Sequence, residues 1–404
     1  MFDFLARLQR SAIFVLVVLT LGAVVAFAAV SHLVTRFNAN QQARGRKLFV
    51  QGLHDMSSGN PTAAIESFRA ALVCDRNNPQ YQLNLGRALR DTGRLEEAES
   101  YLSSLWERTP EDGTINLALA RVAAKRGSIE DALRYYHNAM YGAWSSDADA
   151  NRRKARIELV EFLLQKNALP QAQSELVALS AFLPNDPALR LQAAQLLEQS
   201  QDLPDALTEY EKVLHLDHAN AAALAGAGEV AYHSGQYRTA EHFLRDAVHA
   251  NPNDAGSRAM LESASLILAT DPFIRRISDA ERNRRIEAAF SKSGERLEDC
   301  AKSKGISLSD VSNAGTPFLA GVARSGEVPA SDSNASPIFT LHSHWLSMKP
   351  QLPRLRSAEE TDLPDTIMDL VFQIEQQTAM DCGQPQGVDQ ALLLISHNRE
   401  AVDQ

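Results

Sequence analysis

The hydrophobic pattern divides the chain sharply near its start. Residues 12–34 form a nearly uninterrupted apolar run without a charge, enough for a helix to cross roughly 30 Å of hydrocarbon. A helix buried in a protein core would show a polar stripe, and this run has none. We therefore predict an N-terminal flank at 1–11, a transmembrane helix at 12–34 and a linker at 35–44.

The fate and orientation of this segment have competing interpretations. Arg7 and Arg10 precede the run, and "AFA" at 26–28 fits the cleavage site of a signal peptide. The run continues to Val34, which favours a retained anchor. Basic residues also follow the run, and their count favours a cytoplasmic soluble part. A short basic start before a single apolar run is typical of exported, signal-anchored domains, so we expect the soluble part in the periplasm or another extracytoplasmic space.

From about residue 45 the pattern recurs with a period of 34 residues. An alanine marks the same position of every period: Ala64, Ala98, Ala132, Ala172, Ala206 and Ala240. The spacing is 34 residues within each half, and six residues longer between the halves, near 141–154. That stretch is polar and is most simply a lengthened loop. A period of this length predicts stacked structural repeats that share one core.

These periods resemble the tetratricopeptide repeat, which has a small residue at position 8, Ala at 20, a large apolar residue at 24 and Pro at 32. Position 8 holds Gly52, Gly86, Ala120, Val160, Ala194 and Gly228. Position 32 is Pro110, Pro184 or Pro252 in three repeats, whereas Trp144 and His218 depart from the family, as does Val160 at position 8. Small residues at positions 8 and 20 let the paired helices approach closely, and position 24 is expected to fill the space toward the next repeat.

The resemblance implies an all-α fold, a right-handed α-solenoid of about six helix-turn-helix repeats. We place the solenoid and a capping helix at 45–270. The pattern then predicts a charged helix at 271–305, opened by the capping box "SDAE". A flexible linker at 306–337 and a small, mostly helical segment at 338–404 follow. We expect the last segment to fold back onto the end of the solenoid, with a separate interaction module as the alternative.

Composition and motifs narrow the function. The net charge of −10 and the lack of a basic stripe argue against nucleic acid as the partner. No nucleophile elbow, phosphate-binding Gly-Lys-Ser or paired-histidine zinc helix occurs in the sequence. His342 and His344 lie two apart without further ligands and are more simply surface residues. We expect no catalytic residues, no cofactor, no metal site and no small-molecule substrate, hence no enzyme.

The three cysteines bear on whether the soluble part lies in a reducing or an oxidising compartment. Cys74 falls in the first repeat, where a small buried residue is the simplest interpretation. Cys300 and Cys382 could form a disulfide if they lie outside a reducing cytosol. Two free thiols fit the odd number and the wide spacing equally well.

The resemblance also implies a concave groove that binds a protein or peptide, lined by positions 2, 5, 9, 12 and 13 of each first helix. These positions include Phe49, Leu53, Met56, Arg87, Arg90, Arg121, Lys125, Glu161, Glu198, Glu229 and Tyr232. The residues predict a partner segment whose acidic end lies over the second and third repeats and whose apolar end meets the first repeat. The alternative is a set of solvated charges without a ligand. We therefore predict a membrane-anchored scaffold or adaptor for complex assembly. The alternative is a tail-dependent enzyme or regulatory subunit that uses the repeats as a targeting handle.

Overall fold

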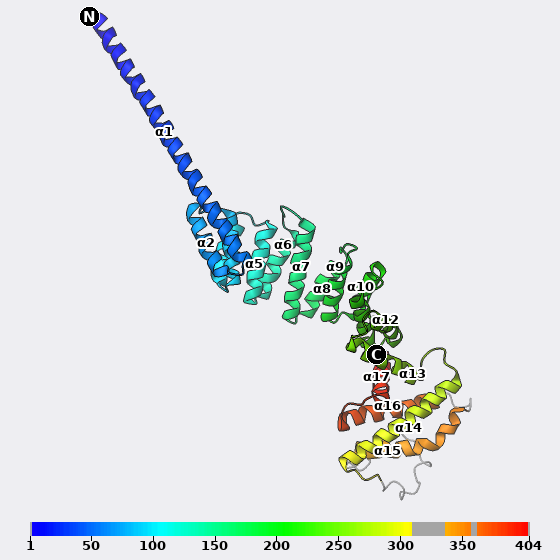
Figure 1. Cartoon of the computed structure of the whole chain (residues 1–404). Helices are drawn as coiled ribbons and strands as arrows, with labels where there is room; N and C mark the ends of the chain where they lie inside the picture. The colour runs from blue at the N-terminus through cyan, green and yellow to red at the C-terminus, as the bar shows by residue number, and fades with distance from the viewer. Residues whose placement is uncertain (1, 309–335, 357–361, 403–404) are drawn as a thin grey trace, which may run out of the picture. The chain divides into compact units, whose positions relative to one another are not determined.

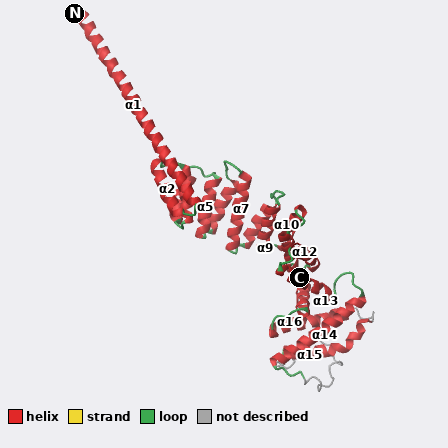
Figure 2. Cartoon of the chain, viewed as in Figure 1, coloured by secondary structure: helices red, strands yellow, loops and turns green. Residues whose placement is uncertain are grey.

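The computed structural model describes residues 2–308, 336–356 and 362–402. Within these ranges every regular element is a helix (Figure 2), which confirms the predicted all-α fold. Most of the predicted linker at 306–337 lies outside the described residues. The chain divides into two compact units, Met1–Ala181 and Phe182–Gln404.

The first unit holds helices that pack in consecutive pairs (Figure 1). They are α1 (Phe2–Ser57), α2 (Pro61–Cys74), α3 (Pro79–Asp91), α4 (Leu95–Trp106), α5 (Gly113–Arg126), α6 (Ile129–Tyr141), α7 (Ala148–Gln165) and α8 (Leu169–Ser180). The end of α1 pairs with α2 as the first repeat, and α3 to α8 supply the next three repeats. This order is the one that the 34-residue frame predicts.

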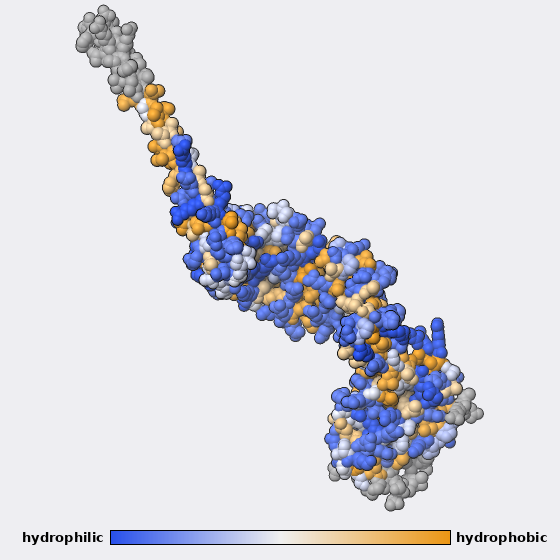
Figure 3. Space-filling model, in the orientation of Figure 1, coloured by the Kyte–Doolittle hydropathy of each residue, from blue (hydrophilic) through white to orange (hydrophobic). Residues whose placement is uncertain are grey.

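Helix α1 continues without a break from the apolar run into the first repeat. The predicted linker at 35–44 is therefore helical instead, because the sequence from residue 23 to 44 has neither glycine nor proline to interrupt a helix. Between Leu19 and Phe37 the large apolar side chains of α1 are exposed, and Figure 3 shows apolar residues along the face of this helix in view. Helix α1 is long and apolar enough to cross a membrane.

The second unit begins with two more helix pairs and ends in a bundle. The helices are α9 (Pro187–Gln199), α10 (Leu203–Leu216), α11 (Ala221–His233), α12 (Tyr237–Ala250), α13 (Ala255–Thr270), α14 (Asp279–Lys304), α15 (Pro337–Met348), the 3₁₀ helix η2 (Lys349–Arg356), α16 (Leu363–Cys382) and α17 (Val388–Val402). Helices α9 to α12 form the fifth and sixth repeats. Helix α13 packs against α12 and α11, as expected for a capping helix.

The turn inside each repeat fixes the register of the frame. Position 15 has a positive φ in all six repeats, at Gly59, Gly93, Gly127, Asn167, Gln201 and Gly235. Glycine adopts this conformation readily, and asparagine tolerates it better than most residues. Its recurrence at one position supports the six-repeat frame, including the fourth repeat beyond the six-residue slip.

After α1, the first helices of the repeats and the capping helix α13 begin in a common way, with the exception of α7. An Asn or Asp side chain accepts hydrogen bonds from the first turn of α3, α5, α9, α11 and α13, and so satisfies amides that the helix leaves unpaired. Helix α7 follows Asp147, whose φ is 48° and whose side chain makes no such bond. The exception falls at the insertion between the third and fourth repeats.

The core of each repeat depends on small residues that face large ones. The six alanines at position 20 are fully buried. A Cβ built on Gly86 would lie 2.8 Å from the side chain of Leu102, and one on Gly52 would lie 2.5 Å from the ring of Phe68. Position 24 therefore packs first onto position 8 of its own repeat, whereas we expected it to fill the space toward the next repeat. At Gly52 and Gly86, a residue larger than glycine would displace the facing side chain.

The C-terminal helices fold back onto the end of the solenoid, as predicted. Ile267 of α13 belongs to the same buried cluster as residues of α14, α15, α16 and α17. Arg285 of α14 donates hydrogen bonds of 2.8 Å to the carbonyls of Leu268 and Asp271 and so caps α13. Asn398 of α17 donates to the carbonyl of Gly235 at 3.2 Å. The helix α14 starts at the predicted capping box, where Ser278 Oγ accepts from the Glu281 amide.

A buried carboxyl group lies inside this C-terminal bundle. Glu375 of α16 is fully buried, and neither carboxyl oxygen has a hydrogen bond among the described residues. Arg296 Nε lies 3.3 Å from Glu375 Oε2, but it also donates to Thr378. Burial, and secondarily the nearby Asp389, raises the pKa of Glu375 to about 8. The bundle therefore holds Glu375 protonated at neutral pH.

The first prediction concerns the close helix contact in the sixth repeat. Ala240→Leu should lower the free energy of unfolding by about 1 to 3 kcal/mol, because Ala240 is fully buried and a larger side chain forces the helices apart. The control Arg238→Ala alters an exposed residue and should change stability by less than about 0.5 kcal/mol. Thermal unfolding of both variants measures the difference. Equal melting temperatures would contradict the frame.

The second prediction concerns Glu375. Its pKa is near 4.5 when unfolded and about 8 in the folded chain, so the folded state binds more protons over that interval. Stability should fall as the pH rises from about 4.5 to about 8. Glu375→Gln cannot lose a proton and should flatten this slope, whereas Glu298→Gln, at an exposed position of α14, should not. Melting temperatures at pH 5 and pH 8 measure this pH dependence of stability. An unchanged slope in Glu375→Gln would contradict the raised pKa of Glu375.

Candidate protein interface

The first helices of neighbouring repeats lie beside each other within each unit. Helix α3 contacts α5 in the first unit, and α11 contacts α9 and α13 in the second. In the first unit α3, α5, the start of α7 and the loop before it line an open hollow of about 400 Å³, here called the cationic hollow. It is lined by Arg87, Thr114, Leu117, Arg121, Trp144, Ser145, Ser146, Asn151 and Lys154.

Arg121, on α5, is already paired within the protein. Its Nε and Nη2 donate to the two carboxylate oxygens of Glu158 at 2.8 and 2.7 Å, a two-bond geometry that fixes both side chains. Hydrogen bonding to the Glu158 carboxylate raises the pKa of Arg121, despite burial. The charge is present, but Glu158 balances it.

Arg90 and Lys125 are also engaged. Arg90 donates to Asp91 Oδ1 through Nε at 2.8 Å and Nη2 at 2.6 Å. The Nζ of Lys125 donates to the carbonyl of Arg90 at 2.8 Å and stays exposed to solvent. Of this pair, Lys125 is the cation that remains available to a partner.

Arg87, on α3, differs from its neighbours. Among the described residues it has no ion pair or side-chain hydrogen bond, and its Nε is buried without an acceptor. Burial, followed by the positive charges of Arg121 and Arg90, lowers the pKa of Arg87. A partly desolvated cation without a partner is costly. An anion placed in the cationic hollow would relieve that cost.

The first repeat offers less apolar surface than we expected. Phe49 stacks on Tyr81 with ring centroids 4.9 Å apart and also lies 5.6 Å from Phe68. It therefore contributes to packing between helices rather than to an open surface. Leu53 is 41% exposed and Met56 is half-buried, so Leu53 is the apolar side chain most open to a partner.

The acidic residues predicted to line the groove are only partly available to a partner. Glu161 on α7 is exposed, and burial of its carboxyl, with Glu158 nearby, raises its pKa. In the second unit, Glu198 accepts a hydrogen bond of 2.6 Å from Tyr210. Glu229 is half-buried, and the Tyr232 hydroxyl bonds Ser263 at 2.7 Å. Tyr232 is thus held against α13 by its own unit.

The sequence alone did not reveal the role of the insertion. The pattern predicts only a longer connection at 141–154, yet Trp144, Ser145 and Ser146 form one wall of the cationic hollow and α7 begins within this stretch, at Ala148. The signal was present in the replacement of the usual proline at position 32 by Trp144. Its meaning depends on a contact with α5, which the sequence pattern does not encode.

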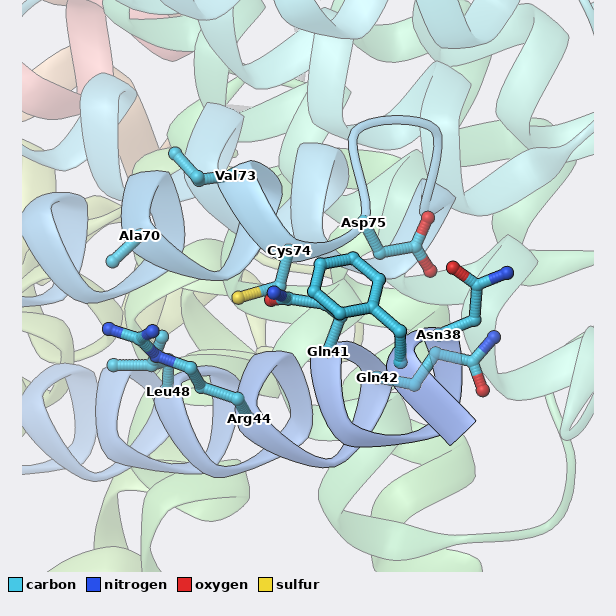
Figure 4. Close-up of a pocket in the computed structure, with 10 residues that line it drawn as sticks. Asn38, Gln41, Gln42, Arg44, Leu48, Ala70, Val73, Cys74 and Asp75 are labelled. Atoms are coloured by element: carbon cyan, nitrogen blue, oxygen red, sulfur yellow. The ribbon is translucent and has the colours of Figure 1, made fainter. Parts of the chain in front are cut away.

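A second hollow, of about 690 Å³, lies between α1 and α2, and Figure 4 shows side chains from both helices around it. Its lining mixes apolar residues such as Leu48 and Val73 with amides of α1. The free thiol of Cys74 is half-buried there. A Cβ on Gly45 would lie 3.1 Å from Cys74 Cβ, so packing against α2 favours the absence of a side chain at Gly45.

The remaining cysteines meet in the C-terminal bundle. Cys300 of α14 and Cys382 at the end of α16 have bonded sulfur atoms and Cα atoms 5.7 Å apart, a separation usual for a disulfide. The two helices are separated by 82 residues of sequence at this point. Sequence spacing could not have chosen between a bond and free thiols, because their proximity depends on the packing of the two helices.

Comparison with known proteins agrees with the repeat frame. A model of the tetratricopeptide repeat family matches residues 55–122 and 197–264. Together with the paired helices and their recurring turn, this match shows that the chain contains tetratricopeptide repeats. The two matched segments flank the stretch that contains the insertion. The search of curated proteins returned no match to this chain.

The solved structures that match this chain share little sequence with it. PilF of Pseudomonas aeruginosa is 17% identical, with 55% of this chain and 97% of that chain covered and a TM-score of 0.38. YrrB, a tetratricopeptide repeat protein with an unusual peptide-binding site, is 18% identical, with coverage of 48% and 97% and a TM-score of 0.37. PilW, a type IV pilus biogenesis factor, is 15% identical, with coverage of 54% and 98% and a TM-score of 0.39.

Proposed function

We propose that this chain is a membrane-anchored scaffold that binds another protein along the first helices of repeats one to four. The observation that carries the proposal is the cationic hollow, where Arg87 and Lys154 have no ion-pair partner among the described residues. Proteins normally pair or solvate their charges, so an unpaired and partly buried cation on an open face favours an external anion. Tetratricopeptide repeats as a class present such faces to protein partners.

The charges on this face indicate which kind of partner segment it would bind. A carboxylate that accepts from Arg87 would gain a charge-assisted hydrogen bond, worth roughly 1.5 to 3 kcal/mol. The exposed Lys125 would add long-range attraction that guides encounter. Leu53, on the end of α1, would supply an apolar contact beyond the charged residues. An acidic segment with an apolar flank is therefore the partner chemistry that this face favours.

The C-terminal bundle is proposed as the end of the scaffold rather than as a separate active module. Its core is continuous with α13, and its side chains cap α13 and contact the turn after α11. A tail that carried an independent activity would be expected to have a core of its own. The observations here favour the scaffold function over the tail-dependent alternative.

The third prediction tests the face directly. A photo-reactive benzoylphenylalanine is placed at Leu53 or at Glu161 of the full chain in its native membranes; both are exposed and occupy position 9 of their first helices. Both variants should cross-link to the same partner protein. The matched control is Val73, which is 88% exposed on the second helix α2, and it should give no such adduct. Identification of adducts by mass spectrometry decides the outcome. Absence of adducts at both positions, or the same adducts from Val73, contradicts the proposal.

We further propose that α1 anchors the chain and that the soluble part lies on the exported side. The exposed apolar side chains between Leu19 and Phe37 favour a lipid environment for this stretch. A bond between Cys300 and Cys382 favours an oxidising compartment. The linkage would also stabilise the bundle, because it joins residues that are far apart in sequence.

The fourth prediction addresses both parts of this proposal in one preparation. After an alkaline carbonate wash, the full chain should remain in the membrane pellet, because a spanning helix does not depend on charge for its attachment. In the denatured, unreduced pellet a maleimide should label one cysteine, Cys74, and after reduction three. Release by carbonate would contradict the anchor, and three labelled cysteines before reduction would contradict the exported side.

A further inference from the structure

The insertion between the third and fourth repeats is an ordered wall. Its backbone pairs with the turn before α5: the Gly113 amide donates to the Ala143 carbonyl at 2.8 Å, and the Ala143 amide donates to the Glu111 carbonyl at 2.8 Å. Asn151 donates from Nδ2 to the Ser146 carbonyl at 2.9 Å and closes the loop from the side of α7. Bonds at both ends hold the loop in one place.

Trp144 fixes the loop to the start of α5. Its Nε1 donates to the Ala139 carbonyl at 2.9 Å. A Cβ built on Gly113 would lie 2.4 Å from the indole ring, so the ring covers this glycine at van der Waals distance. With the ring in this position, Ser145 and Ser146 line the cationic hollow beside α3 and α5.

The charges around the cationic hollow leave an unbalanced positive field. Of its three cations, Arg121 is balanced by Glu158, whereas Arg87 and Lys154 have no ion pair among the described residues. Asp91 and Asp112 act on Arg87 only at longer range and do not outweigh burial and the neighbouring arginines in lowering its pKa. Serine hydroxyls on the loop add hydrogen-bond donors next to these cations.

We propose that the insertion and Arg87 together form a specific pocket for a carboxylate side chain of an acidic peptide segment. Arg87 and Lys154 supply the charge, Ser145 and Ser146 supply hydrogen bonds, and the hollow of about 400 Å³ has room for a single side chain and its backbone. This inference rests on the proposed function and adds to it the position and the chemistry of the recognition site. It assigns to the extra six residues the role of completing the site.

The fifth prediction uses defined probes on the full chain in detergent micelles. Fluorescein-labelled hexaglutamate should bind, and hexaglutamine of the same length should not, as measured by fluorescence anisotropy at low salt. Arg87→Gln and Lys154→Gln should each weaken hexaglutamate binding at least fivefold. Ser146→Glu, at an exposed position of the loop, should weaken it more than tenfold by repulsion. The matched control Arg108→Gln removes the same charge at an exposed residue outside the hollow and should change the affinity less than twofold.

Several outcomes would overturn the pocket. One is a loss of affinity in Arg108→Gln equal to that in Arg87→Gln, which would indicate general charge attraction. Another is unchanged binding by Ser146→Glu with an unchanged melting temperature. Inorganic phosphate and a phosphoserine peptide serve as competitors for hexaglutamate binding. If they displace hexaglutamate at concentrations at which free glutamate does not, the ligand group of the pocket is a phosphoryl group and not a carboxylate. None of these results depends on cross-linking from Leu53 or Glu161, so the pocket can fail while the scaffold function stands.

Discussion

Contact between a small residue on the first helix and a large one on the second sets the geometry of every repeat but the fourth, where Val160 takes the place of the small residue. Gly86 beneath Leu102 and Gly52 beneath Phe68 leave no space for even one more carbon without displacement. The fully buried alanines at position 20 complete the close approach. Because the two helices of a pair meet at this distance, their outer surfaces are free to pack on neighbouring repeats. The stacking of the repeats and the surfaces that they expose therefore depend on this close contact within each helix pair.

Once the helices are placed, internal pairing decides which charges are available for recognition. Arg90 and Arg121 occupy corresponding faces of α3 and α5, but Asp91 and Glu158 engage them. Arg87 has an equivalent repeat position to Arg121 and no acidic neighbour within ion-pair distance among the described residues. The difference arises from one residue: Glu158, on α7, faces Arg121. An arginine without such a neighbour is the one that an external carboxylate can satisfy.

The insertion shows how a repeat fold acquires a site of its own. A regular repeat array offers similar faces along its length, since each unit contacts only its neighbours. Six extra residues break that regularity, change the start of α7 and bring Trp144 onto Gly113. The local turn after α6 becomes a wall of the cationic hollow. The same hydrogen bonds that satisfy the loop backbone hold this wall in place, so the departure from the repeat is ordered.

The sequence by itself determined the repeat frame, because close packing and left-handed turns restrict residue type at fixed positions. The alanines at position 20 and the glycines at position 15 show this most clearly. It also determined the apolar N-terminal helix, since hydropathy is a local property. It could not tell that Phe49 stacks on Tyr81 or that Cys300 lies beside Cys382. Nor could it show that Arg121 has an acidic partner whereas Arg87 has none among the described residues. Each of these depends on which distant side chains become neighbours, and only the tertiary structure decides that.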